Sequence, residues 1–230
     1  MEYLESEIFL IAFTFAVYWG AKKLQSATDL VILNPMLITI AVLIAFLKLT
    51  GISYSTYYSG GRMIEFWLKP AIVALGVPLY AQINTIRRQL LPIVMSQFAG
   101  CLTGIISVTL IAKGLGASRE VIISLAPKSV STPIALEISS KLDGIPSLTA
   151  AIVVCVGLIG SIFGMKVLTY GHISSPIAQS LSMGTAAHVI GTTRVAEYGD
   201  RYGAYATLGL IINGVLTSVL AGPILRLMGI

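Results

Sequence analysis

The sequence predicts an all-α membrane protein, a polytopic bundle of helices, and three observations support this fold class. Of the 230 residues, 56% are apolar and 11% are charged, and the mean hydropathy is +0.88. Because a soluble domain has about 25% charged residues, this chain has too few to cover a water-facing surface. The apolar residues come in blocks of about 20, the length of a membrane-spanning helix. Such blocks favour helices over the alternating strands of a membrane barrel.

The same composition excludes a disordered protein, a nucleic-acid-binding protein and a secreted disulfide scaffold. The net charge of +5 is ordinary for a membrane protein with basic loops. Both cysteines, Cys101 and Cys155, lie within apolar runs, where they would pack as small apolar side chains. Residues 1–7 contain three glutamates and no basic residue, the wrong charge for a signal peptide. We therefore expect the first helix to remain in the mature protein.

Six apolar runs are each expected to cross the membrane. In chain order they cover residues 4–21, 30–47, 66–86, 89–112, 144–165 and 202–225. The first is followed by two lysines and the third by two arginines. Because basic residues favour the cytoplasmic side, we expect these ends in the cytoplasm and the N-terminus outside. Residues 51–62 would then form an external loop.

Two further segments, residues 121–141 and 177–201, are apolar enough for a membrane but hold titratable side chains. Such groups are costly inside a bilayer and usually serve a function. The chain also repeats weakly with a period of 60, which aligns residues 89–139 with 149–199. The matched pairs are Gly100 and Gly160, Gly104 and Gly164, Ala126 and Ala186, Thr132 and Thr192, and Glu137 and Glu197.

Each repeat unit, about residues 89–141 and 149–201, would hold one G-x-x-x-G helix followed by one polar segment. If each polar segment enters the membrane and returns, the two units are inverted, whereas if each crosses fully they are parallel. Precedent among transporters favours inversion. We expect residues 1–230 to form a single membrane transport domain.

The first polar segment is expected to break between Pro127 and Pro133, because proline lacks an N–H and disfavours a helical residue before it. A new half-helix would then start at a serine or threonine cap. Unpaired N–H groups at such a break are costly in lipid, so a polar occupant is needed. A small anion is expected there, because a helix N-terminus favours negative charge. The substrate-binding candidates of this segment are Lys128, Ser129, Ser131 and Thr132.

In the second polar segment, Gly191 is expected to supply the break and Thr192 or Thr193 the cap. His188, Thr192 and Arg194 complete the candidate substrate site. Pseudo-symmetry would bring the two breaks face to face at one midplane site, as alternating access requires.

Several of these residues have a second interpretation. Lys128 could instead reach a membrane interface, His188 could couple protons or only fix structure, and Arg194 could bind a carboxylate or lipid headgroups. Glu137 and Glu197 could bind protons or cations, or form ion pairs with Lys128 and Arg194. Asn213 is a candidate for interhelical hydrogen bonding before it is a ligand.

The sequence contains no H-E-x-x-H pair, Walker loop or G-x-S-x-G elbow. His172 and His188 are its only histidines and are not spaced for a metal. We therefore expect neither an enzyme nor a bound metal or cofactor. The asymmetric, proline-broken segments also differ from the like-charge rings of a channel.

Four motifs together resemble the LrgB/CidB/YohK family of bacterial membrane proteins: Asn34-Pro35, residues 70–80, residues 127–135 and residues 184–197. The resemblance implies a holin-like or antiholin-like role in murein hydrolase export and autolysis. A similar domain in the plastidial glycolate/glycerate translocator instead implies transport of small monocarboxylates such as pyruvate, glycolate or glycerate. The family also implies a location in the bacterial cytoplasmic membrane and a small membrane partner of the LrgA/CidA type.

Of these two roles, the two broken segments favour the carrier, because a hole-former does not need a pair of mirrored anion sites. We therefore expect a small carboxylate anion and membrane lipid as partners, a homodimer, and no nucleic acid.

Overall fold

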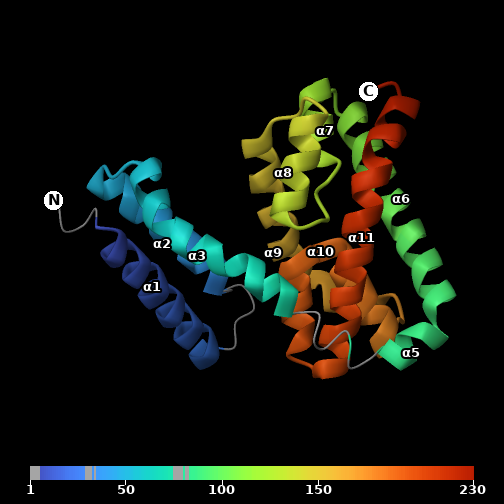
Figure 1. Cartoon of the computed structure of the whole chain (residues 1–230), viewed down its shortest axis with the longest axis horizontal. Coiled ribbons are helices and arrows are strands. Elements are labelled where there is room, and N and C mark those ends of the chain that lie inside the picture. The colour runs from blue at the N-terminus through green and yellow to red at the C-terminus, as the bar shows by residue number, and fades with distance from the viewer. Residues whose placement is uncertain (1–5, 29–32, 34, 75–79, 81–82) are drawn as a thin grey trace. The chain divides into compact units, whose positions relative to one another are not determined.

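All regular elements in the described part of the chain are α-helices, which confirms the predicted fold class (Figure 1). The structure is a computed structural model that describes residues 6–28, 33, 35–74, 80 and 83–230. The chain divides into two units, Met1–Gly76 and Val77–Ile230. That the whole chain forms one transport domain stays a prediction.

The first unit contains α1 (Glu7–Thr28), α2 (Pro35–Thr50) and α3 (Tyr54–Ala74). Helix α1 packs against both others. The rings of Phe13 and Phe46 join it to α2 with centroids 4.4 Å apart. The hydroxyls of Thr14 and Tyr57, 2.9 Å apart, join it to the start of α3.

The predicted external loop at residues 51–62 is wrong, because α3 already begins at Tyr54. Ser53 starts this helix as an N-cap, since its Oγ accepts a hydrogen bond of 3.1 Å from the Thr56 N–H. The predicted third span, residues 66–86, starts inside α3, which ends at Ala74. Parts of the first three predicted spans lie outside the described residues, namely 4–5, 30–32, 34, 75–79 and 81–82, and so does Asn34 of the family motif.

The second unit contains seven helices with described bounds: α5 (Ile83–Arg88), α6 (Leu90–Gly114), α7 (Arg119–Leu125), α8 (Thr132–Lys141), α9 (Pro146–Tyr170), α10 (Pro176–Ala196) and α11 (Asp200–Leu227). Within the described ranges, α6, α9 and α11 are long and apolar enough to cross a membrane, and α2 is a shorter apolar helix. These helices support a membrane protein. The predicted total of six spans is not confirmed.

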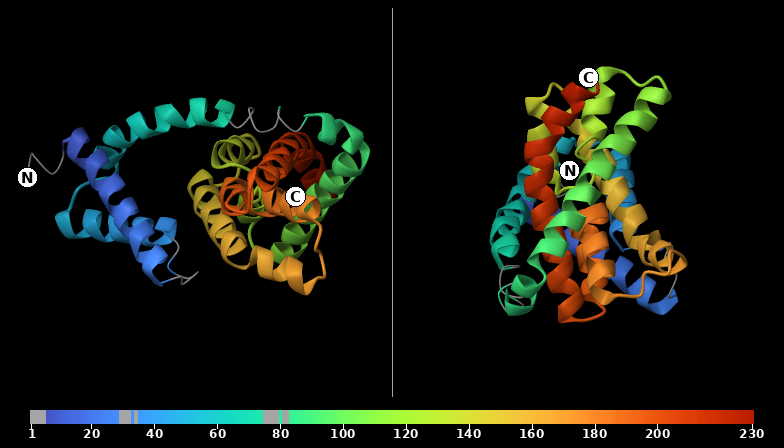
Figure 2. Two further views of the ribbon diagram at one scale, coloured as in Figure 1. Left: turned by 90° about the horizontal axis from the view of Figure 1, so that it is seen from below. Right: turned by 90° about the vertical axis from the view of Figure 1, so that its right-hand side faces the viewer.

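Helices α6 and α11 run side by side in the same direction. Midway along both, Cys101 Sγ lies 3.4 Å from Thr217 Oγ1. At their C-terminal ends, Lys113 Nζ donates to the Met228 carbonyl at 2.9 Å. Figure 2 shows this pair from two further directions.

Helix α9 runs in the opposite direction to α6 and α11. Helix α8 follows the direction of α11, since Gly214 faces Ile134 and, two turns on, Gly222 faces Leu142. Just after α8 the chain reverses into α9, where Thr149 Oγ1 donates to Ser139 Oγ at 2.8 Å. The long helices of the two repeat units are therefore antiparallel.

Both polar segments enter the bundle and return to the end from which they came. In the first hairpin, formed by α7, residues 126–131 and α8, the exit lies beside the entry because the Ile145 N–H donates to Ser124 Oγ at 2.7 Å. The second hairpin is α10, which turns at His188. A Cβ on Gly191 would lie 2.7 Å from the Met183 carbonyl oxygen, a distance that a straight helix does not allow.

The two hairpins enter from opposite ends of the bundle (Figure 1). Together with the antiparallel α6 and α9, this arrangement is the inverted one of the two alternatives. The register differs from the sequence alignment, because the long helices begin at Leu90 and Pro146, 56 positions apart instead of 60.

The largest apolar cluster closes one end of the second unit. It joins α6, the first hairpin and the last turns of α11. Its buried members are Cys101, Ile105, Ala112, Ile122, Ile123, Ala126, Ile138, Ala221, Ile224 and Leu225. We call this group the apolar seal.

Candidate functional site

The first hairpin is interrupted where the prolines predict. Helix α7 ends at Leu125 and α8 begins at Thr132, with Pro133 in its first turn. Ser131 occupies the predicted N-cap position, but its side chain makes no capping hydrogen bond. The chain between the two helices forms a buried tip at Val130.

The second hairpin breaks at His188, three residues before the predicted Gly191. His188 has φ 44° and ψ −137°, and it is only 3% exposed. Its Nε2 donates to the Val153 carbonyl at 2.7 Å. Gly157 makes room for the ring, since a Cβ there would lie 2.5 Å from His188 Cε1.

Gly191 has a packing role instead. It lies in the returning half of the hairpin, and a Cβ there would lie 2.5 Å from that of Ala187. The predicted cap at Thr192 or Thr193 is also wrong. Thr192 Oγ1 donates to the His188 carbonyl at 2.8 Å and Thr193 Oγ1 to that of Ile190 at 2.9 Å.

The two hairpin tips meet at Asn213 of α11. Its Nδ2 donates to the Ser129 carbonyl at 3.0 Å and to the Thr185 carbonyl at 3.1 Å. Val153 links the tips on another side, because it packs against Val130 and its carbonyl accepts from His188. The proximity that a shared site requires is therefore present.

A cavity of about 770 Å³ lies beside these tips, between α6, the first hairpin, α10 and α11. It extends to Gln89 and Ser175, at the starts of α6 and α10. The apolar seal extends from the cavity toward the other end of these helices, and its members Cys101, Ile105 and Ala126 also line the cavity. Polar groups on the wall near the tips are Gln97, Lys128, Ser129, Thr185, Asn213 and Thr217.

Lys128 is half-buried on this wall, and its Nζ donates to Ser129 Oγ at 3.1 Å. Among the described residues no carboxylate lies within 4.0 Å of that Nζ. An ammonium group removed from water is costly unless an opposite charge accompanies it. The wall thus presents one cation that a bound anion would neutralise.

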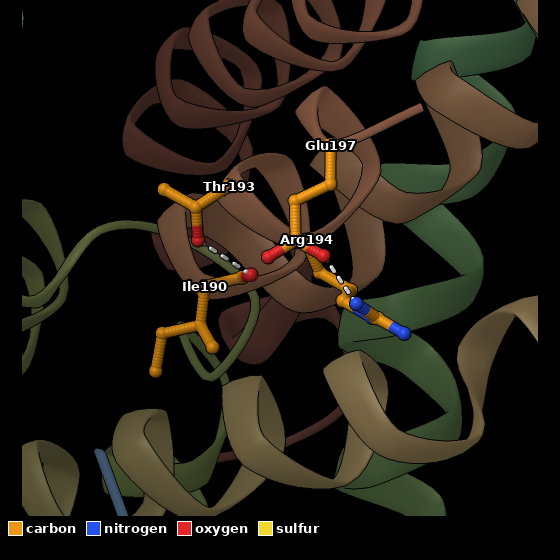
Figure 3. Close-up of polar contacts among 4 residues, drawn as sticks. All are labelled: Ile190, Thr193, Arg194 and Glu197. Atoms are coloured by element: carbon orange, nitrogen blue, oxygen red, sulfur yellow. Dashed lines mark hydrogen bonds and ion pairs between the residues drawn. The ribbon is translucent and has the colours of Figure 1, made fainter. Parts of the chain in front are cut away.

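Five of the seven predicted substrate-binding residues do not line this cavity in the part of the chain that the structure describes: Ser131, Thr132, His188, Thr192 and Arg194. Arg194 pairs with Glu197, the residue that follows α10, as the ion-pair alternative has it (Figure 3). Its guanidinium carbon lies 5.9 Å from the centre of the Tyr198 ring. The roles of all seven in binding stay predictions.

Glu137 pairs with Lys141 at 3.0 Å, one turn along α8, so its expected pairing with Lys128 is wrong. The Glu137 side chain is 66% exposed. An exposed pair at this spacing forms locally and contributes little. A coupling role for Glu137 or Glu197 is not tested by these contacts.

Sequence reasoning missed Gln97, Thr185 and Thr217. Of these three, only Gln97 could have been identified from the sequence, because it is the only amide side chain within α6. Asn213 makes hydrogen bonds between helices, as expected, but its two acceptors could not be foreseen. The described residues contain no group of three or more His, Cys, Asp or Glu side chains that could hold a metal ion.

Comparison with known proteins confirms the family resemblance. The model of the LrgB-like family matches residues 14–227. The holin-like protein CidB of Staphylococcus epidermidis is 34% identical over 227 residues, 99% of this chain and 98% of that protein. CidB of Staphylococcus aureus is 35% identical over 221 residues, 96% of each chain. The uncharacterized protein YwbG of Bacillus subtilis is 35% identical over 212 residues, 92% of this chain and 94% of that protein. No solved structure matches the chain.

Proposed function

We propose that this chain, which belongs to the LrgB-like family, carries small monocarboxylate anions of the pyruvate, glycolate and glycerate class across a membrane by alternating access. The proposal includes no covalent step, so the protein would not be an enzyme. It further includes the bacterial cytoplasmic membrane as the location, an external N-terminus, a homodimer and a small membrane partner of the LrgA/CidA type.

The observation that carries the proposal is Lys128. A lysine within a membrane segment is costly unless it is paired or reaches water, and this one is half-buried on a cavity wall without a carboxylate partner among the described residues. A carboxylate would lower that cost by accepting charge-assisted hydrogen bonds from Nζ and from the Ser129 hydroxyl. Anion binding thus explains why the tip holds a cation.

The shape of the cavity supports a carrier rather than an open pore. The cavity extends toward the starts of α6 and α10, while the apolar seal fills the bundle at the opposite end. One accessible end and one closed end describe one state of an alternating-access cycle. The inverted arrangement of the hairpins suits the opposite state, in which the first hairpin would move instead of the second.

Uptake of labelled pyruvate into proteoliposomes tests the proposal. We expect saturable uptake that Lys128→Ala abolishes. Lys141→Ala is the matched control, because Lys141 is exposed on the same hairpin and pairs with Glu137. Uptake that does not saturate, or that is equal in wild type and Lys128→Ala, would contradict a carrier.

A holin-like role is the second candidate, and the relatives favour it. Proteins named holin-like protein CidB are 34–35% identical to this chain over nearly its full length. A pore would release a large uncharged dye from the same proteoliposomes, with little effect of Lys128→Ala. A carrier would retain the dye while it takes up carboxylate.

A further inference from the structure

Gln97 places a primary amide in the middle of an apolar helix. It is 3% exposed and lies on the wall of the cavity that also contains Lys128. Its Oε1 is held by Thr185 Oγ1. A primary amide has two hydrogens to donate as well as its oxygen, and removal of such a group from water is costly when those hydrogens have no acceptor.

The amino group of Gln97 makes no hydrogen bond to a described residue, and it is not among the fully buried polar atoms without a partner, so it keeps some accessible surface. Because Thr185 restrains the oxygen, the orientation of the amide is fixed. The single hydroxyl hydrogen of Thr185 goes to Gln97 Oε1, and the Leu181 carbonyl, 2.6 Å from the same Oγ1, restricts where that hydroxyl can lie. The hydrogens of Gln97 are therefore available to a guest in the cavity.

Asn213 connects the surroundings of Gln97 with those of Lys128. One of its amide hydrogens bonds the carbonyl of Thr185, the residue that holds Gln97. The other bonds the carbonyl of Ser129, the neighbour of Lys128. The residue that holds Gln97 and the neighbour of Lys128 are thus bound to one amide, and both Gln97 and Lys128 line the same cavity.

Two glycines of α6 give this pair its space. Gly100 brings α6 close to α10, because a Cβ there would lie 3.3 Å from Thr185 Cγ2. Gly104, one turn further along the cavity wall, would have nothing within 4 Å of an added Cβ. The wall is thus tight where Gln97 is held and open beside it.

We propose that Gln97 is a second substrate-binding group, which donates a hydrogen bond to an oxygen substituent of the anion whose carboxylate binds Lys128. This inference rests on the proposed function and adds a selectivity residue to it. The site would prefer an acid with a hydroxyl or oxo group near its carboxylate over the unsubstituted acid of the same length. Without that oxygen, the Gln97 hydrogens lose their acceptor when the substrate displaces water.

The test compares lactate with propionate as competitors of pyruvate uptake in proteoliposomes. The two acids have the same carbon chain and differ by one hydroxyl. One hydrogen bond from a held amide corresponds to about a tenfold difference in affinity. In wild type we expect lactate to compete about tenfold better than propionate, and in Gln97→Met we expect equal competition, with propionate unchanged.

Gln179→Met is the matched control. Gln179 is also a buried amide of the second unit, but its Nε2 donates to the Ile173 carbonyl at 2.8 Å and it is not part of the cavity wall. This variant should keep the preference for lactate. If Gln97→Met does not fold, Gln97→Asn serves instead, since it keeps the amide but withdraws it by one methylene and should also lose the preference.

The outcomes separate the two proposals. Saturable, Lys128-dependent uptake with the same lactate preference in wild type and in the Gln97 variant overturns the role of Gln97 and leaves the carrier intact. Equal competition by lactate and propionate in the wild type also overturns the role of Gln97 and leaves the carrier intact. Absence of saturable uptake in wild type overturns the carrier and this inference with it.

Discussion

Asn213 offers a sharp test of the arrangement of the hairpins, because one side chain holds both tips. Its amide is 2% exposed and makes two hydrogen bonds of 3.0 and 3.1 Å to carbonyls of different hairpins. Asn213→Leu keeps the branched shape of the side chain and removes both donors. A lost hydrogen bond costs about 1 kcal/mol, and a buried carbonyl left without a donor costs about 1–3 kcal/mol.

We therefore expect Asn213→Leu to lower the free energy of unfolding by about 3 kcal/mol. For a chain of this size that corresponds to a fall of roughly 9 °C in Tm. Thermal unfolding of the purified protein in detergent, followed by circular dichroism, measures it. Asn213→Asp should be at least as destabilising, because carboxylate oxygens would face the same two carbonyls.

A Tm of Asn213→Leu within about 2 °C of wild type would refute this reasoning. It would mean that the tips are held by other contacts, such as the packing of Val153 on Val130. The inference that Asn213 connects the surroundings of Gln97 with those of Lys128 would then lose its basis.

The remaining predictions concern α6. Thr109 is fully buried and its hydroxyl has no partner in the described part of the chain. Thr109→Val should therefore raise the free energy of unfolding by about 1 kcal/mol. If thermal unfolding instead shows a fall of the same size, the hydroxyl has a hydrogen-bond partner and the reasoning is wrong. Gly104→Leu should add a side chain to the cavity without a clash, leave Tm unchanged and reduce pyruvate uptake at least about tenfold. Normal uptake by a stable Gly104→Leu protein would place the substrate path elsewhere.

The first interruption could be predicted because its cause is local. Pro127 and Pro133 restrict the backbone wherever they stand, and in the structure α7 ends at Leu125, just before the first, while α8 starts at Thr132, just before the second. The Arg194–Glu197 pair is equally local, three residues apart at the C-terminal end of α10. Local geometry of this kind can be read from a single sequence.

The second interruption could not be predicted, because its cause is tertiary. A histidine rarely adopts positive φ, and His188 does so where the Val153 carbonyl accepts from its ring and Gly157 leaves space for it. From the sequence alone, Gly191 suggests a break in the helix. In the structure it instead allows the two halves of α10 to pack closely. A glycine serves either purpose, and only the fold distinguishes them.

The cavity wall depended on the fold in the same way. Gln97 and Thr185 are 88 residues apart and meet only because α6 and α10 pack together. Lys128 was identified from its own context, since a lysine between two prolines in an apolar segment is exceptional wherever the chain folds. The sequence therefore indicated the cation and its neighbour Ser129, but not the groups that α6, α10 and α11 bring to the wall.

Equilibrium binding of labelled pyruvate to the purified protein tests the central claim most directly. If Lys128 neutralises the bound carboxylate, Lys128→Met should weaken binding at least about tenfold, because a hydrogen bond to a charged group contributes about 1.5–3 kcal/mol. Lys141→Met, which removes an exposed lysine from the same hairpin, should bind as wild type does. Equal affinity in wild type and Lys128→Met would contradict the account.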